Sequence, residues 1–171
     1  MKKFFAGIDN AEDLKKEYFR LAKMFHSDLN GGSDETMKQI NAEYDELFRV
    51  LRNVHKSTRE ETAGQTYTAE KETSEVPEDF IGIVSHLLKL DGLNIELVGR
   101  WIWISGQTMK HKDALKACGC RWSSSKKMWS WHYSKDDTPY HKREISMKEI
   151  RNKYGSEMIS GIRPDLDALP A

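Results

Sequence analysis

The sequence predicts an α+β protein in which a helical N-terminal module is joined by a linker to a small sheet module with flanking helices. Apolar residues recur at helical spacing through residues 11–51, whereas they alternate with other residues, as in strands, after residue 93. Between these regions lies a stretch without apolar periodicity. We therefore predict four segments: a helical domain over 1–56, a flexible acidic linker over 57–76, a helix with a ββαββ sheet over 77–143, and a short helix with an irregular tail over 144–171.

The N-terminal region has the periodicity of two helices. Apolar residues of the first helix share one stripe: Leu14, Tyr18, Leu21, Ala22 and Phe25. Asn10 is placed to cap this helix, and the pair Gly31-Gly32 ends it. A second helix begins at Ser33 or Asp34, with the stripe Met37, Ile40, Tyr44, Leu47, Phe48 and Leu51. Because the loop is short, we expect the two helices to pack as an antiparallel hairpin.

The central and C-terminal regions change in character along the chain. Residues 57–76 are rich in Thr and Glu, which predicts a flexible linker. Pro77 opens a further helix. Residues 93–105 alternate on either side of Gly99-Arg100, which predicts a hairpin with a two-residue turn. A short helix near 111–117, a second hairpin over 120–133 and a last helix over 146–155 follow.

Charge separates the modules although the net charge of the 171 residues is zero. Residues 57–91 carry three basic and eight acidic side chains, a net of −5. Residues 92–143 carry ten basic and four acidic ones, a net of +6. A neutral total therefore hides a basic module behind an acidic connector.

Composition and cysteine usage predict a cytoplasmic protein. The apolar stretches are too short to span a membrane, and the N-terminus has no apolar core of a secretion signal. Cys118 and Cys120 are separated by one glycine, so that a bridge between them would be strained. We expect free thiols in a reducing compartment.

The N-terminal module resembles the J-domain of DnaJ-type co-chaperones. The segments "LKKEYFRLAKMFHSD" (14–28) and "MKQINAEYDEL" (37–47) are similar to helices II and III of that family. The loop "HSDLNGG" (26–32) stands where the family has its His-Pro-Asp signature, and "FAGI" (5–8) where it has the end of helix I. The resemblance covers roughly residues 1–52.

This resemblance implies that the module docks on a DnaK-type chaperone and stimulates its ATPase. The implied docking residues are Lys15, Lys16, Arg20, Lys23, His26 and Asp28. Ser27 departs from the family because it replaces the proline, which would fix its own φ and keep His26 out of helical geometry. We therefore expect a more mobile loop and a helix that runs on past Phe25. The alternative is a J-like fold kept only as a binding scaffold.

The C-terminal module is aromatic and basic, which is typical of single-stranded nucleic-acid binding. Aromatic faces stack on bases and neighbouring cations attract phosphates. The candidate residues for a client or nucleic acid are Trp101, Trp103, Arg121, Trp122, Lys126, Lys127, Trp129 and Trp131. The alternative is that most tryptophans form the sheet core, with Trp101 and Trp103 on one face and Ile102 and Ile104 on the other. Residues 93–133 are also similar to small α/β modules of phage and mobile-element proteins.

The sequence contains no recognisable catalytic or metal-binding motif. The cysteines and the histidines His111, His132 and His141 do not have the spacing of a standard zinc site. No nucleophile elbow or phosphate loop is present. We expect neither a cofactor nor an enzyme.

These observations favour a two-module adaptor that engages a DnaK-type chaperone and links it to a protein or nucleoprotein client, encoded by a phage or mobile element. Two alternatives remain open. One is a non-enzymatic inhibitor of a host nucleic-acid-targeting defence complex. The other is a nucleic-acid-binding accessory protein that acts through the second module alone.

Overall fold

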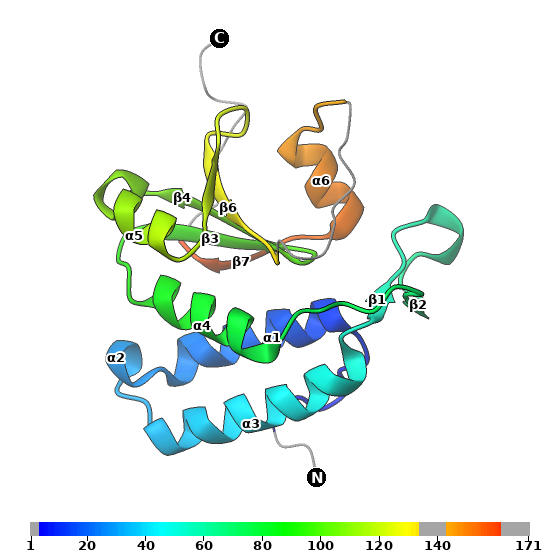
Figure 1. Ribbon diagram of the computed structural model, residues 1–171, viewed down its shortest axis with the longest axis horizontal. Coiled ribbons are helices and arrows are strands. Elements are labelled where there is room, and N and C mark those ends of the chain that lie inside the picture. The colour runs from blue at the N-terminus through cyan, green and yellow to red at the C-terminus, as the bar shows by residue number, and fades with distance from the viewer. Residues whose placement is uncertain (1–3, 134–142, 162–171) are drawn as a thin grey trace. The chain divides into compact units, whose positions relative to one another are not determined.

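The computed structural model describes residues 4–133 and 143–161, and these form a mixed α+β structure with helices in the N-terminal part and a sheet in the C-terminal part (Figure 1). The described residues divide into two compact units. Unit 1 comprises residues 4–89 with Tyr133, and unit 2 comprises residues 90–132 with 143–161. Each unit has its own hydrogen-bonded elements.

Unit 1 is built from α1 (Ala11–Phe25), α2 (Ser27–Asn30), α3 (Asp34–Leu51) and α4 (Pro77–Leu88). The side chain of Asn10 caps α1 as predicted, because its oxygen accepts a hydrogen bond from the backbone N–H of Asp13. The helices α1 and α3 form the predicted hairpin, and the short turn of α2 lies at the bend between them (Figure 1).

Aromatic rings fill the core of unit 1. The rings of Tyr18 on α1 and Tyr44 on α3 lie 4.5 Å apart, and Phe80 of α4 stacks on Tyr44 at 6.0 Å. The hydroxyl of Tyr18 donates to Asn41 across the hairpin at 2.9 Å. Our prediction grouped residues 77–88 with the sheet, but the structure assigns α4 to unit 1, because Phe80 completes this aromatic cluster.

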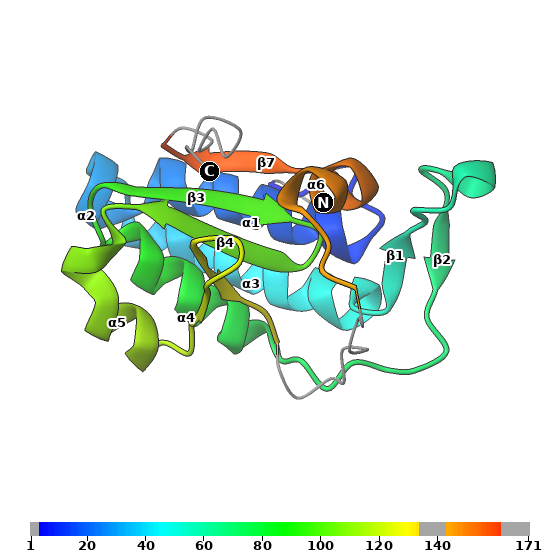
Figure 2. The same ribbon diagram turned by 90° about the horizontal axis from the view of Figure 1, so that it is seen from above.

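Residues 57–76, for which we predicted a flexible linker, have regular structure in part. Strand β1 (Val54–Lys56) pairs antiparallel with β2 (Thr66–Thr68), and a 3₁₀ turn (Glu60–Thr62, η1) lies between them. This hairpin extends from one end of the helices (Figure 2). Hydrogen bonds rather than apolar residues hold it, which is why apolar periodicity gave no sign of it.

Unit 2 contains a five-stranded antiparallel sheet in the order β5-β6-β4-β3-β7. Its strands are β3 (Leu93–Val98), β4 (Trp101–Gly106), β5 (Arg121–Ser123), β6 (Met128–Trp131) and β7 (Glu157–Ser160). A 3₁₀ turn (Thr108–His111, η2) and α5 (Lys112–Ala117) connect β4 to β5. The pairing of Val98 with Trp101 leaves the predicted two-residue turn, with Gly99 at φ +58°.

The C-terminal segment contains a strand that the sequence did not predict. Helix α6 (Met147–Tyr154) begins with a capping box between Ser146 and Glu149. The chain then pairs as β7 along β3, where we expected an irregular tail. Four residues are too few for alternation to stand out from background. The remainder of that tail, 162–171, and residue 141 lie outside the described residues.

Candidate functional site

The bend between α1 and α3 carries the histidine and aspartate that the sequence singled out. Helix α1 ends at Phe25, and His26 is extended at φ −65° and ψ 125°. The prediction that the helix runs on past Phe25 is therefore wrong. Nδ1 of His26 accepts the backbone N–H of Asp28 at 3.3 Å and so caps α2, which replaces the restraint of the missing proline.

Two glycines let the chain turn back at this bend. Gly31 has the left-handed φ of +62°. Gly32 lies so close to the end of α1 that a Cβ atom there would be 2.0 Å from the carbonyl oxygen of Phe25. The loop is thus closed tightly against α1, and the helix cannot be extended without moving Gly32.

His26 and Asp28 differ in exposure. His26 is only 9% exposed, and its Nε2 lies 3.5 Å from the hydroxyl of Ser85 on α4. Since Nδ1 accepts a hydrogen bond, Nε2 carries the proton of the neutral ring and faces Ser85. The side chain of Asp28 is 60% exposed, with Oδ2 3.9 Å from His26 Nδ1 and 3.8 Å from Lys89 Nζ. The bend therefore exposes the carboxylate of Asp28, while the buried imidazole of His26 accepts a hydrogen bond from the Asp28 backbone.

A pocket of about 260 Å³ opens beside this carboxylate. Its polar lining comes from the bend and from helices α3 and α4: His26, Ser27, Asp28, Asp34, Asn41, Ser85 and Lys89. The apolar wall includes Met37 and Ile81. Helix α4 thus takes part in the site, which the sequence analysis did not anticipate because it placed α4 in the other module.

Helix α1 presents cations next to the bend. Lys16 and Arg20 are exposed and Lys23 is half-buried. Arg20 forms an ion pair with Glu17 one turn earlier. Together with Asp28 of α2, at the bend that follows α1, these side chains form what we call the α1 face: Lys16, Arg20, Lys23 and Asp28.

Lys15 does not belong to the α1 face. It is 2% exposed, and its ammonium group donates to both carboxylate oxygens of Glu75 at 2.6 and 2.8 Å. It also lies 5.0 Å from the centroid of the Phe80 ring. The burial of Lys15 could have been predicted from its spacing. It follows Ala11 by four residues and precedes Tyr18 by three, which places it on the buried stripe. The assignment of Lys15 to the docking surface is corrected.

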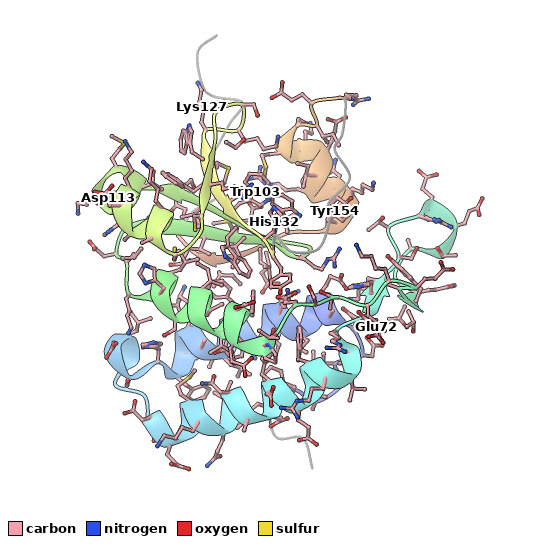
Figure 3. All side chains as sticks on the ribbon, in the orientation of Figure 1. Glu72, Trp103, Asp113, Lys127, His132 and Tyr154 are labelled. Atoms are coloured by element: carbon pink, nitrogen blue, oxygen red, sulfur yellow. The ribbon has the colours of Figure 1, made fainter. Side chains whose placement is uncertain are left out.

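Most of the predicted aromatic site of unit 2 is core. Trp103, Trp129 and Trp131 are buried, and Trp101 is half-buried, with its ring stacked on Trp103 at 5.7 Å. The predicted alternation is confirmed, since Trp103 packs with Val98, Met128 and Met147 of α6 while Ile102 and Ile104 point to the other face. Figure 3 shows Trp103 on the sheet and Tyr154 on α6.

The exposed part of that site lies on the β5–β6 hairpin. Trp122 is 51% exposed and packs edge-on against Trp129, its cross-strand partner. Arg121 and Lys127 are exposed, and Lys127 lies at the turn (Figure 3). Lys126 is half-buried, with Nζ 6.0 Å from the Trp103 ring centroid. Buried rings cannot stack on bases, so Trp103, Trp129 and Trp131 leave the predicted site. Its exposed members are Arg121, Trp122 and Lys127, whereas Trp101 and Lys126 are half-buried.

Comparison with protein-family models, with curated proteins and with solved structures finds no match. Within residues 4–133 and 143–161, no helix has the length and apolar character needed to cross a membrane. The same residues contain no group of three His, Cys, Asp or Glu side chains placed to hold a metal ion.

Proposed function

We propose that the chain is a J-domain-like adaptor that binds a DnaK-type chaperone through the α1 face and links it to a client. The observation that carries the proposal is the exposed carboxylate of Asp28 at the bend that follows α1, a helix that exposes Lys16 and Arg20. A row of cations followed by an exposed carboxylate suits a partner with an acidic groove and a donor at its end.

The surroundings of the bend support a positioning role for His26. Its ring accepts the Asp28 amide and is itself held beside Ser85, so the Asp28 side chain is presented from a restrained loop. A restrained loop loses less conformational entropy on binding than a mobile one. In this proposal Asp28 and the cations contact the partner, and His26 holds the loop that presents Asp28.

The test is the ATPase rate of a purified DnaK-type chaperone with increasing amounts of the full chain. We expect saturable stimulation, and we expect Asp28→Asn to abolish it because the amide loses the negative charge. Glu46→Gln is the matched control, since Glu46 is an exposed carboxylate on α3 away from the bend. An unchanged rate at saturating wild-type protein contradicts the proposal.

The role of the α1-face cations can also be tested with a matched control variant. Arg20 and Arg49 both lie on helices and each pairs with a carboxylate on its own helix, Glu17 and Asp45 respectively. We expect Arg20→Glu to weaken chaperone binding at least about tenfold, because a reversed charge at an interface disfavours association by more than about 1.4 kcal/mol. Arg49→Glu should leave binding unchanged. Equal losses in the two variants contradict a specific α1 face.

A second function, nucleic-acid binding, is favoured by one observation, the exposure of Trp122 on a hairpin that also exposes Arg121 and Lys127. Base stacking on such a ring contributes about 1–3 kcal/mol per base. Fluorescence titration with a single-stranded oligonucleotide at low salt tests it. We expect quenching that disappears in Trp122→Leu and weakens with salt. Absence of quenching in the wild type at low salt contradicts this function.

A further inference from the structure

The segment Cys118-Gly119-Cys120 holds two thiols side by side at the end of α5. The sulfur atoms lie 3.6 Å apart. Gly119 has φ +86°, a conformation that favours glycine. The backbone is held in place because the N–H groups of Cys118 and Cys120 donate to Ala114 and Leu115, at 3.1 and 2.9 Å. The two sulfurs are therefore brought together by the fold of the turn.

The two thiols have different surroundings. Cys118 is half-buried and its sulfur also lies 3.2 Å from the carbonyl oxygen of Leu115, whereas Cys120 is 5% exposed. The hydrogen bond from the Cys120 thiol lowers the pKa of Cys118 to about 7, although burial opposes this. The same hydrogen bond, together with burial, raises the pKa of Cys120. At neutral pH the more accessible sulfur is thus the better nucleophile and the buried one keeps its proton.

We propose that Cys118 and Cys120 form a dithiol site that reacts with low-mass disulfides such as oxidised glutathione and closes reversibly to an intrachain disulfide. The thiolate of Cys118 attacks one sulfur of the small disulfide, which breaks that bond, forms a mixed disulfide and releases one thiolate. The thiol of Cys120 then loses its proton to water and attacks Cys118 Sγ. This closes the Cys118–Cys120 bond and releases the second small thiol. The dithiol is oxidised by two electrons and the small disulfide is reduced to two thiols.

The single residue between Cys118 and Cys120 makes a disulfide between them unsuitable as a permanent structural bridge but reactive. A disulfide across a single intervening residue is strained, and strained disulfides are readily reduced. The closed form therefore returns to the dithiol when small thiols are in excess. This inference is independent of the proposed chaperone function, since it concerns other residues and another reaction.

The experiment treats the reduced full chain with oxidised glutathione at neutral pH, blocks remaining thiols with an alkylating reagent at successive times, and measures intact mass. We expect the wild type to lose two hydrogen atoms and to take up no alkyl group. Cys120→Ser should stop at the mixed disulfide with one glutathione. Cys118→Ser should react at least about tenfold more slowly, because the remaining thiol is buried and protonated.

The wild type alone decides the proposal if a variant does not fold. A Cβ atom at Gly119 would lie 3.9 Å from Nε1 of Trp131, so the turn is next to this indole. Closing the disulfide should therefore change tryptophan fluorescence, and reduced glutathione should reverse the change. A wild-type chain that keeps two alkylatable thiols after this treatment overturns the proposal. Equal reaction rates of Cys118→Ser and Cys120→Ser overturn the assigned order of attack.

Discussion

At the scale of single residues, neighbouring lysines of α1 have opposite roles. Lys15 is buried in an ion pair with Glu75, and Lys16 is exposed on the α1 face. A buried pair loses most when one partner is removed, because the other charge remains buried without compensation. Both residues are lysines, and only their positions on the helix make one of them buried in an ion pair and the other exposed.

We predict that Lys15→Met lowers the free energy of unfolding by about 3–5 kcal/mol, because the Glu75 carboxylate is left buried and unpaired. Lys16→Met is the control and should change stability by less than about 0.5 kcal/mol. Urea denaturation followed by circular dichroism measures both. The double variant Lys15→Met with Glu75→Leu should recover most of the loss, since it removes both charges. Similar stabilities of the two single variants would contradict the buried pair.

Ser27 stands where the structure accepts a proline. His26, which precedes it, is already extended at ψ 125°, as a residue before proline must be. Ser27 is also the first residue of α2, a position at which the backbone N–H has no partner within the helix. We predict that Ser27→Pro raises stability by about 0.4–1 kcal/mol through the unfolded chain. It should also raise stimulation of the chaperone ATPase, because the bend is fixed more firmly. A loss of both would show that the serine itself is required.

At the scale of elements, the hairpin β1–β2 is joined to the start of α1 by charged side chains. Nδ1 of His55 lies 2.8 Å from Glu12, and Lys56 pairs with Asp13 at 2.5 Å. Burial raises the pKa of Glu12, but the hydrogen bond and charge of His55 and the backbone N–H of Lys56 outweigh it. The pKa of Glu12 is therefore held below its ordinary value of 4.5.

A lowered pKa in the folded state predicts the direction of the pH dependence. Because the folded state binds fewer protons than the unfolded state, this stabilisation is complete above pH 4.5 and is lost as the pH falls through the lowered pKa. We predict that Glu12→Gln lowers the free energy of unfolding by about 1–2 kcal/mol at pH 7, and that the difference shrinks on acidification to pH 3. Urea titrations at several pH values measure it. A constant difference between the two proteins would contradict the assignment.

The same elements show what the sequence can and cannot predict. The long helices α1 and α3 were predicted because many residues contribute to the period of each buried stripe. The Asn10 cap of α1 was predicted as well. The hairpin β1–β2 and strand β7 were missed, since each is short and depends on pairing partners distant in sequence. Asp28 became a candidate because the loop of His26 and Asp28 resembles the His-Pro-Asp signature of J-domains, whereas Ser85 and Lys89 lie beside this loop through the packing of α4.

At the scale of the whole molecule, each of the two units carries a different kind of surface. Unit 1 carries the α1 face, with cations and one carboxylate, and unit 2 carries the exposed ring and cations of the β5–β6 hairpin. In unit 2 the buried tryptophans are already committed to packing with Met128 and Met147. The proposed adaptor function requires that binding on one unit leave the surface of the other unit available.

We predict that the two surfaces fail separately. Arg20→Glu should raise the concentration needed to stimulate the chaperone ATPase at least about tenfold and leave quenching by a single-stranded oligonucleotide unchanged, because Arg20 belongs to unit 1. Trp122→Leu should remove the quenching and leave the ATPase stimulation unchanged, because Trp122 belongs to unit 2 and its ring, 51% exposed, packs edge-on against Trp129. Thermal unfolding of both variants controls for loss of fold. If each substitution abolished both activities while the variants stayed folded, the two surfaces would act as one site, and the chain would not be an adaptor with separable modules.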